Sequence, residues 1–195
     1  MFFLVLTSIA GVTFMIERGL ALRWKKVIPP EVEDAVDRCS SNPADGAAIV
    51  ERACKAHPSP LSSLLLTAHE HLDWPKQENV DSVETRARHE VMQLERGLVI
   101  LEIIVGIAPL TGLVGTLHGL ITLFAALGTA GISDNAALAK GISIALNTTL
   151  MGLIVAIPAL ITWSYYNKRV ETLAIEMESV CDQFLRCQYR DKVVA

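Results

Sequence analysis

Charged side chains are missing from three long stretches of this 195-residue sequence. Residues 1–16, 103–133 and 141–167 contain no Asp, Glu, Lys or Arg, and the first stretch extends past one charged pair to Leu22. A helix needs roughly 17–25 mostly apolar residues to cross the hydrocarbon core of a bilayer. Because 51% of the residues are hydrophobic, the pattern excludes an ordinary soluble domain and predicts an all-α membrane protein with three transmembrane helices.

A basic segment is missing before the first apolar stretch. A signal peptide would need such a segment together with a small-residue cleavage site. In this chain the basic residues follow the apolar run, beginning with Arg18, Arg23, Lys25 and Lys26. The sequence therefore favours a transmembrane helix over residues 1–23 and leaves a signal peptide as the weaker alternative.

Enzyme signatures are also lacking. The sequence contains no GxSxG, HExxH, Walker or kinase motif, and the histidines of His69-Glu70-His71 have the wrong spacing for two metal ligands on one helix face. The formal net charge of −4 gives no sign of a nucleic-acid-binding surface. We therefore predict that the chain is not an enzyme and holds no cofactor or metal.

Cysteine pairs of the CxxC type are absent, and no histidine stands at zinc-site spacing. The four cysteines are Cys39, Cys54, Cys181 and Cys187. All four fall in segments predicted to be cytoplasmic, where thiols stay reduced. We expect them to be small buried apolar side chains.

Basic residues are scarce in the link between the second and third spans, which offers only Lys140. They are frequent after the first span, before the second and after the third. By the positive-inside rule we predict that the N-terminus and the loop 129–138 lie outside and that the C-terminus lies inside.

Apolar spacing and turn residues divide the chain further. One of several short helices predicted over 24–79 has Asn42 as its N-cap and Pro43 at its first position. A longer helix is predicted over 80–128, because no proline or glycine interrupts the apolar spacing before Arg96. The predicted segments are a first transmembrane helix 1–23, short cytoplasmic helices 24–79, a long cytoplasmic helix continuing into the second transmembrane helix 80–128, an outside loop 129–138, a third transmembrane helix 139–167 and a cytoplasmic extension 168–195.

Two apolar stripes lie along the predicted cytoplasmic helices. One runs from Val83 to Leu98, and the other, from Val170 to Cys187, alternates spacings of three and four as a coiled-coil seam does. Either these stripes pack on each other and on the helices of 30–75, or they also pack between subunits. The sequence leaves both interpretations open.

The second and third apolar stretches carry residues that a plain membrane anchor does not need. Gly115 and Gly119 form a small-xxx-small pair that lets helix backbones approach closely, and each proline frees a carbonyl that needs another partner in lipid. We expect close helix–helix contact at these positions. The predicted packing residues are Gly112, Gly115, Gly119, Pro109 and Pro158.

Hydroxyl groups accompany the glycines. A threonine in a membrane helix usually bonds to its own i−4 carbonyl. Here, however, Thr116 lies between two glycines, and Asn147, Thr148 and Thr149 are adjacent in the third span. Two facing helices with hydroxyls at similar depth can line a narrow polar path, and Asn147 needs a partner across a helix interface.

Two further polar residues lie in or near the second span. His118 is either a proton carrier or a neutral histidine that donates to a neighbouring carbonyl, and the lack of an acidic partner at matching depth favours the second. Glu102, near the cytoplasmic end, either snorkels or pairs with Arg96 or an arginine of a neighbour.

The segments APLTGLVGTLHGLITLF and GISIALNTTLMGLIVAIPALITWSYYN resemble the ExbB/TolQ/MotA family of inner-membrane proton channels, most closely its ExbB/TolQ branch. The resemblance covers roughly residues 97–167. The matching positions are Pro109-Leu110, Gly112-Leu113, Gly115-Thr116 and Gly119 in the second span, and Ala145-Leu146, Thr149, Gly152-Leu153, Ala156-Ile157-Pro158 and Tyr166-Asn167 in the third.

This resemblance implies a ring of five copies in the bacterial inner membrane, with the N-terminus in the periplasm. It implies a pore that holds an ExbD/TolR-like single-span partner, whose membrane aspartate takes up and releases protons. Proton flow would drive rotation and deliver work to the periplasm or outer membrane. Three spans argue against the flagellar MotA branch, which has four.

The resemblance also assigns roles to residues. Thr116 and Thr149 fall on the pore-lining threonines of the family, and Thr148 and Asn147 adjoin them. One position departs, because Ile144 stands where the family has a glutamate in the third span. Either the aspartate of the partner is sufficient, which we favour, or the ion differs, or the chain is a specialised paralogue.

The sequence thus predicts the channel-forming subunit of an ion-driven motor. A non-conducting scaffold of the same fold, which only holds a partner helix, is the alternative that the missing glutamate suggests. A small-molecule transporter is a weaker candidate, because the chain has no inverted repeat and no charged site at the membrane midplane.

Overall fold

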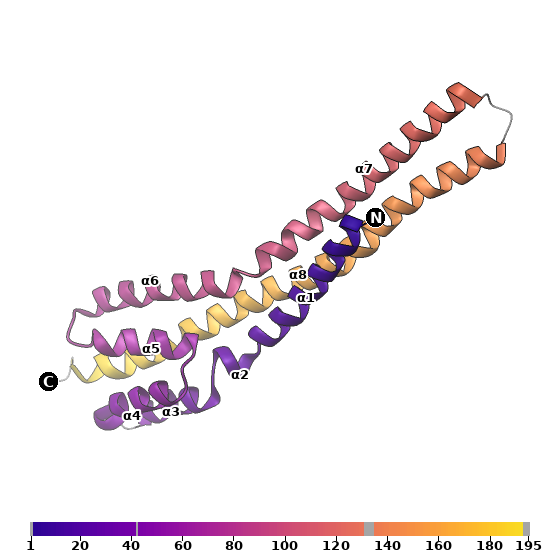
Figure 1. Ribbon diagram of the computed structural model, residues 1–195. Coiled ribbons are helices and arrows are strands. Elements are labelled where there is room, and N and C mark those ends of the chain that lie inside the picture. The colour runs from indigo at the N-terminus through magenta and orange to yellow at the C-terminus, as the bar shows by residue number, and fades with distance from the viewer. Residues whose placement is uncertain (1, 42, 131–134, 193–195) are drawn as a thin grey trace. The chain divides into compact units, whose positions relative to one another are not determined.

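The computed structural model describes residues 2–41, 43–130 and 135–192, and this part of the chain is helical with short turns and no strands. The predicted all-α class is therefore confirmed. Figure 1 shows the helices in chain order. They are α1 (Phe2–Ala21), α2 (Trp24–Val27), α3 (Pro30–Ser41), α4 (Pro43–Ala56), α5 (Pro60–Glu70), α6 (Lys76–Glu95), α7 (Leu98–Ala130) and α8 (Asn135–Lys192).

The chain divides into two compact units. One, which we call the membrane unit, consists of Met1–Arg18 and Gly97–Tyr165. The other, which we call the second unit, consists of Gly19–Arg96 and Tyr166–Ala195.

Three helices, α1, α7 and α8, are long and apolar enough to cross a membrane. In the membrane unit their large apolar side chains point outward, as lipid-facing or helix-facing residues do. Pro109 lies inside α7 and Pro158 inside α8, and neither proline ends its helix. The exposed side chains include Val5, Ile9, Leu110, Val114, Leu117, Ile121, Phe124, Leu150, Ile154, Ile157 and Ile161.

The structure differs from the expectation of one unbroken helix over 80–128. Helix α6 ends at Glu95, and Arg96 and Gly97 form a turn before α7 begins at Leu98. A Cβ atom at position 97 would collide with the guanidinium of Arg18. Any other residue there would have to displace the Arg18 side chain, and glycine also has a low helix propensity, which favours a turn at this point.

The loop predicted at 129–138 is described only in part. Helix α7 ends at Ala130 and α8 begins at Asn135, and residues 131–134 lie outside the described residues. The predicted N-cap Asn42 also lies outside them, whereas α4 begins at Pro43 as the sequence predicts.

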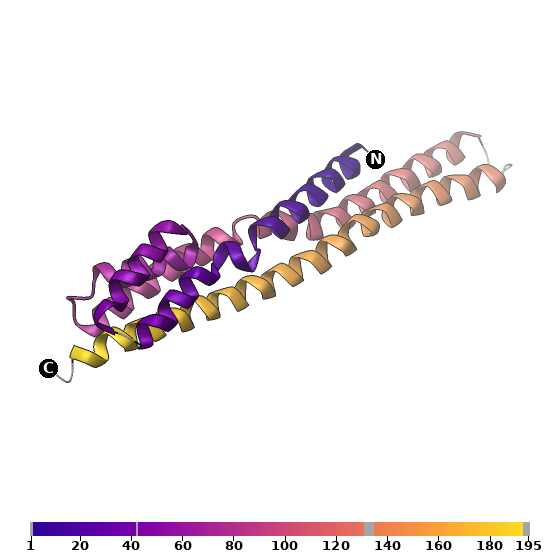
Figure 2. The same ribbon diagram turned by 90° about the horizontal axis from the view of Figure 1, so that it is seen from below.

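The second unit has a continuous apolar core. Helices α3 to α6 lie beside the C-terminal part of α8 (Figures 1 and 2). Fully burying a large apolar side chain stabilises the fold by about 1.5–3 kcal/mol. The most deeply buried large side chains are Val27, Ile28, Val32, Val36, Val50, Leu61, Leu64, Leu65, Leu173, Met177 and Phe184.

The apolar stripe of α8 packs inside this core. Val170, Leu173, Met177, Val180 and Phe184 are all buried. Of the two interpretations of this stripe, packing within the chain therefore holds for these residues. The α6 stripe is less covered, because Val83 and Leu94 are buried but Ala87 and Val91 are only half-buried.

Candidate functional site

Three threonine hydroxyls meet where α7 and α8 pack in the membrane unit. The Thr116 hydroxyl of α7 is hydrogen-bonded to the Thr149 hydroxyl of α8 and lies 3.5 Å from that of Thr148. All three side chains are half-buried. We call Thr116, Thr148 and Thr149 the hydroxyl cluster.

Backbone carbonyls complete the cluster. The Thr116 hydroxyl lies 3.1 Å from the Ala145 carbonyl oxygen and 3.2 Å from that of Gly112. Thr148 donates to the Ala145 carbonyl at 2.7 Å, and the Thr149 hydroxyl lies 3.3 Å from the Gly112 carbonyl. Two carbonyl oxygens and three hydroxyl oxygens offer more acceptor sites than there are hydroxyl hydrogens, so the hydrogen bonds of the cluster can exchange between acceptors.

Glycine lets the two helices approach this closely. A Cβ atom at Gly112 would lie 3.0 Å from both the Thr148 carbonyl oxygen and the Thr149 Cα. A Cβ atom at Gly152 would lie 2.7 Å from the Ala108 carbonyl oxygen. These neighbours are backbone atoms that cannot rotate away, so α7 and α8 contact each other directly through their backbones.

The other predicted glycines lie on the same seam. A Cβ atom at Gly115 would lie 2.9 Å from the Thr148 hydroxyl, and one at Gly119 would lie 3.1 Å from the Ala145 Cβ. The structure thus brings Gly112, Gly115 and Gly119 together with the hydroxyl cluster.

The remaining predicted site residues lie elsewhere. Asn147 is exposed and lines a shallow groove of about 630 Å³ on α8, formed with Ser143, Leu146 and neighbouring residues. The structure therefore separates Asn147 from the hydroxyl cluster. Pro158 is exposed and Pro109 is half-buried.

His118 and Glu102 are both exposed on α7. Among the ion pairs of the described residues, none includes Glu102. Within the part of the chain that the structure describes, no group of three His, Cys, Asp or Glu residues is placed to hold a metal ion.

Sequence reasoning gave no packing role to the small residues on the α8 side of the seam. Ala145, Ala156 and Ala159 are buried, as is Gly152, and a stripe of small residues thus follows one face of α8. The spacing of seven, four and three residues between them is the signal that could have revealed this face.

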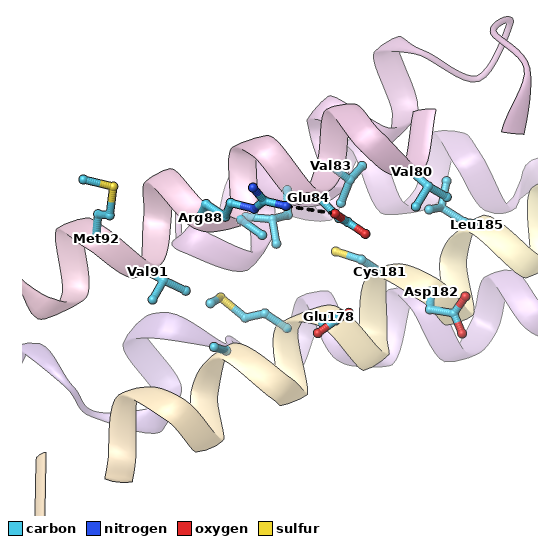
Figure 3. A pocket seen from close by; sticks show the side chains of 14 residues that line it. Val80, Val83, Glu84, Arg88, Val91, Met92, Glu178, Cys181, Asp182 and Leu185 are labelled. Atoms are coloured by element: carbon cyan, nitrogen blue, oxygen red, sulfur yellow. Dashed lines mark hydrogen bonds and ion pairs between the residues drawn. The ribbon is translucent and has the colours of Figure 1, made fainter. Parts of the chain in front are cut away.

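A second concave site lies in the second unit. A groove of about 740 Å³ runs between α6 and α8, and Leu64 of α5 also lines it. Figure 3 shows Val80, Val83 and Val91 on its α6 side, and an ion pair of 3.3 Å between Arg88 and Glu84 at its edge. The groove is therefore apolar inside and charged at its rim. The α8 residues that line it are Ala174, Met177, Glu178, Cys181, Asp182 and Leu185.

Comparison with known proteins decides the family. The model of the MotA/TolQ/ExbB proton channel family matches residues 56–179, which include the hydroxyl cluster and the whole of α7. The chain belongs to the MotA/TolQ/ExbB proton channel family. Members of this family are channels rather than enzymes, in agreement with the missing enzyme motifs, and the chain is a multi-pass membrane protein.

Relatives named ExbB share about a third of their aligned residues with this member of the family. A putative biopolymer transport protein ExbB homolog of Methanothermobacter thermautotrophicus is 34% identical over 75% of the chain and 51% of its own length. A putative ExbB-like protein 1 of Synechocystis sp. is 35% identical over 84% of the chain and 65% of its own length. ExbB of Aquifex aeolicus is 31% identical over 52% of the chain. The chain thus spans less than two thirds of the length of the first two relatives.

Position 144, where the sequence departs from the ExbB/TolQ pattern, lies on α8. Ile144 is 59% exposed on α8. A branched apolar side chain there neither carries charge nor forms hydrogen bonds, so this subunit offers no carboxylate at that position.

Proposed function

We propose that the chain is the channel-forming subunit of an inner-membrane motor driven by the proton motive force. It works with an ExbD/TolR-like single-span partner that carries a membrane aspartate, and it transmits energy to the periplasm or outer membrane. The observation that carries this proposal is the hydroxyl cluster shared by α7 and α8 in a chain of a proton channel family.

Hydroxyl groups suit a path for protons. Each one both donates and accepts a hydrogen bond, so it can hold water or pass a proton beside a carboxylate without a charge of its own. The half-buried state of Thr116 and Thr149 leaves one side of the seam open to such a carboxylate. We assign Thr116, Thr148 and Thr149 to the ion path, with Asn147 on the adjoining face of α8.

The carboxylate itself comes from the partner in this proposal. Ile144 supplies no acidic group, and α7 and the membrane part of α8 contain only one acidic residue among those described, Glu102 near the start of α7. A titrating group is needed to pick up a proton on one side of the membrane and release it on the other. The aspartate of a single-span partner meets that need.

Several copies surround the partner. The outward apolar faces of α7 and α8 and the groove between α6 and α8 suit contacts between neighbouring copies. We propose five copies, with the N-terminus in the periplasm and the second unit in the cytoplasm, as the distribution of basic residues favours.

The experiment compares two threonines of α8 in a complex purified with its single-span partner and reconstituted into vesicles. Thr149→Val removes a hydroxyl from the cluster at nearly constant shape, whereas Thr162 donates only to the Pro158 carbonyl of its own helix, at 2.8 Å. We expect Thr149→Val to lower proton flux by about 100-fold, the effect of roughly 2.7 kcal/mol, and Thr162→Val to leave it unchanged.

The missing glutamate favours a second candidate, a non-conducting scaffold that only holds the partner helix. In that case the wild-type complex shows no flux, and Thr149→Val still binds the partner. A chain that purifies without any single-span protein would contradict both candidates.

A further inference from the structure

Two cysteines far apart in the sequence face each other in the second unit. Cys39 lies near the end of α3 and Cys187 near the end of α8, and their Sγ atoms are 3.2 Å apart across a sequence separation of 148 residues. The Cys187 thiol also donates to the Cys39 carbonyl at 3.0 Å, and Gln188 Nε2 donates to Cys39 Sγ at 3.1 Å. Three polar contacts thus hold the two sulfur atoms toward one another.

We propose that Cys39 and Cys187 form a peroxide-sensitive dithiol site, which is oxidised to a disulfide that joins α3 to α8. A disulfide bond is roughly 2.05 Å long, so the sulfur atoms need to approach by only about 1 Å. Rotation about the Cα–Cβ bonds supplies such a movement without a change in the helices.

The oxidation has two steps with hydrogen peroxide as the oxidant. The Cys187 side chain is partly exposed whereas that of Cys39 is buried, so peroxide reaches Cys187 first. The Cys187 thiolate attacks one peroxide oxygen, the O–O bond breaks, and the hydroxide that leaves takes up the thiol proton to become water. Cys187 is then a sulfenic acid.

Cys39 completes the reaction. Its sulfur attacks the sulfenic sulfur, the S–O bond breaks, and the departing hydroxide takes the Cys39 proton to form a second water. The sum is two thiols and one peroxide giving one disulfide and two waters. The hydrogen bond from Gln188 Nε2 holds Cys39 Sγ in its position facing Cys187.

The other two cysteines provide an internal comparison. Cys54 on α4 and Cys181 on α8 are buried at 1% and 2% exposure. Burial raises the pKa of the Cys54 thiol to about 11, and it raises the pKa of Cys181 as well. Little thiolate forms at neutral pH, so these thiols react slowly.

The test exposes the purified full-length chain in detergent to hydrogen peroxide, blocks remaining thiols under denaturing conditions and maps non-reduced peptides by mass spectrometry. We expect a Cys39–Cys187 cross-link to exceed any other cysteine pair by about tenfold, since the two sulfur atoms are already close and Cys187 is partly exposed. Treatment with dithiothreitol should reverse it. Because the wild-type chain gives the primary result, the test does not depend on the folding of a variant.

Two variants check the order of the steps with dimedone, which traps sulfenic acids. Cys39→Ser should leave the Cys187 sulfenic acid without its resolving thiol, so that Cys187 becomes labelled. Cys187→Ser should leave Cys39 largely unlabelled, because that side chain is buried. The proposal is overturned if both thiols remain free after peroxide, or if Cys54 and Cys181 cross-link as readily. Neither outcome bears on proton flux, so this inference and the proposed function fail independently.

Discussion

Asn79 shows how one polar side chain stabilises the second unit. It is 0% exposed, and its Nδ2 donates to the carbonyls of Ala68 at 2.9 Å and His71 at 3.0 Å. The same nitrogen lies 3.1 Å from the Tyr189 hydroxyl, which in turn donates to the Trp74 carbonyl at 2.9 Å. The amide therefore links the end of α5, the start of α6 and the end of α8.

Replacing Asn79 should destabilise this unit. Asn79→Leu removes the side-chain donor to the buried Ala68 carbonyl and leaves the part-buried His71 carbonyl only the Tyr189 hydroxyl at 3.3 Å, which costs about 1–3 kcal/mol in the free energy of unfolding. Chemical denaturation followed by tryptophan fluorescence measures the change, with Trp74 close to the site. Gln77→Leu, at an exposed position of the same helix, is the matched control and should change the free energy little. Equal effects of the two variants would contradict the role given to Asn79.

The glycines of α7 offer a second test at the residue scale. Gly112→Ala places a Cβ atom 3.0 Å from backbone atoms of α8, whereas a Cβ atom at Gly106 would meet nothing within 4 Å. We expect Gly112→Ala to lower the stability of the membrane unit by about 1–3 kcal/mol through overpacking. Gly106→Ala should be neutral or slightly stabilising, since alanine favours helix. Loss of helical ellipticity during titration with sodium dodecyl sulfate measures both.

The sequence predicted which residues of α7 make close helix contacts, but it did not predict which distant residues contact each other. Thr116 and Gly112 stand out in an apolar stretch, and residue type alone indicates contact with another helix. The contacts of Gly97 with Arg18 and of Cys39 with Cys187 are different, because each joins positions far apart in the chain. Local patterns carry no information on such pairs, and folding has to bring them together first.

At the scale of the helix, the start of α5 depends on one hydroxyl. Ser59 has an extended backbone conformation, and its Oγ accepts a hydrogen bond from the Ser62 amide at 3.1 Å. Pro60 follows at the first helical position, where its missing N–H leaves no bond unmade.

Ser59→Ala should therefore weaken α5. It removes the acceptor for a backbone amide, so we expect the free energy of unfolding to fall by about 1 kcal/mol. Ser59→Asp keeps an acceptor and should retain most of the stability. Thermal unfolding in detergent separates the two variants, and a loss with aspartate as large as with alanine would contradict the capping role.

The sequence predicted the presence of the helices more accurately than the residues at which they end. Apolar spacing indicated α6, the membrane helices and the extension of α8, because an amphipathic or uncharged stretch directly reflects what it packs against. The break between α6 and α7 was missed. In the sequence, Gly97 looks like a glycine that a helix tolerates. Only the structure shows that the Arg18 side chain occupies the space that a side chain at position 97 would need.

At the scale of the whole molecule, uncovered apolar surface points to assembly. Met92, at the end of the groove between α6 and α8, is 67% exposed although it is fully apolar. If neighbouring copies cover the groove, Met92 contributes to their contact while adding little to the stability of one copy.

We accordingly expect Met92→Lys to reduce the number of copies in the assembly without unfolding the chain. In an apolar contact between copies, the lysine ammonium group loses its hydration and gains no oppositely charged partner, which disfavours association. Gln93→Lys adds the same charge at the next exposed position and is the control. Native mass measurement in detergent reports the copy number, and a pentamer that survives Met92→Lys would show that the groove is not a subunit contact.

The tight seam between α7 and α8 also has an electrical consequence. Where Gly112 and Gly152 meet, a single added carbon atom would collide with backbone on the facing helix, so a hydrated ion does not fit between these two helices at that level. A lone copy therefore offers no passage for a hydrated ion along its seam at the level of Gly112 and Gly152. Under the proposed function, a path for protons forms only when the carboxylate of the partner lies beside the hydroxyl cluster, so a newly made copy on its own does not dissipate the proton gradient.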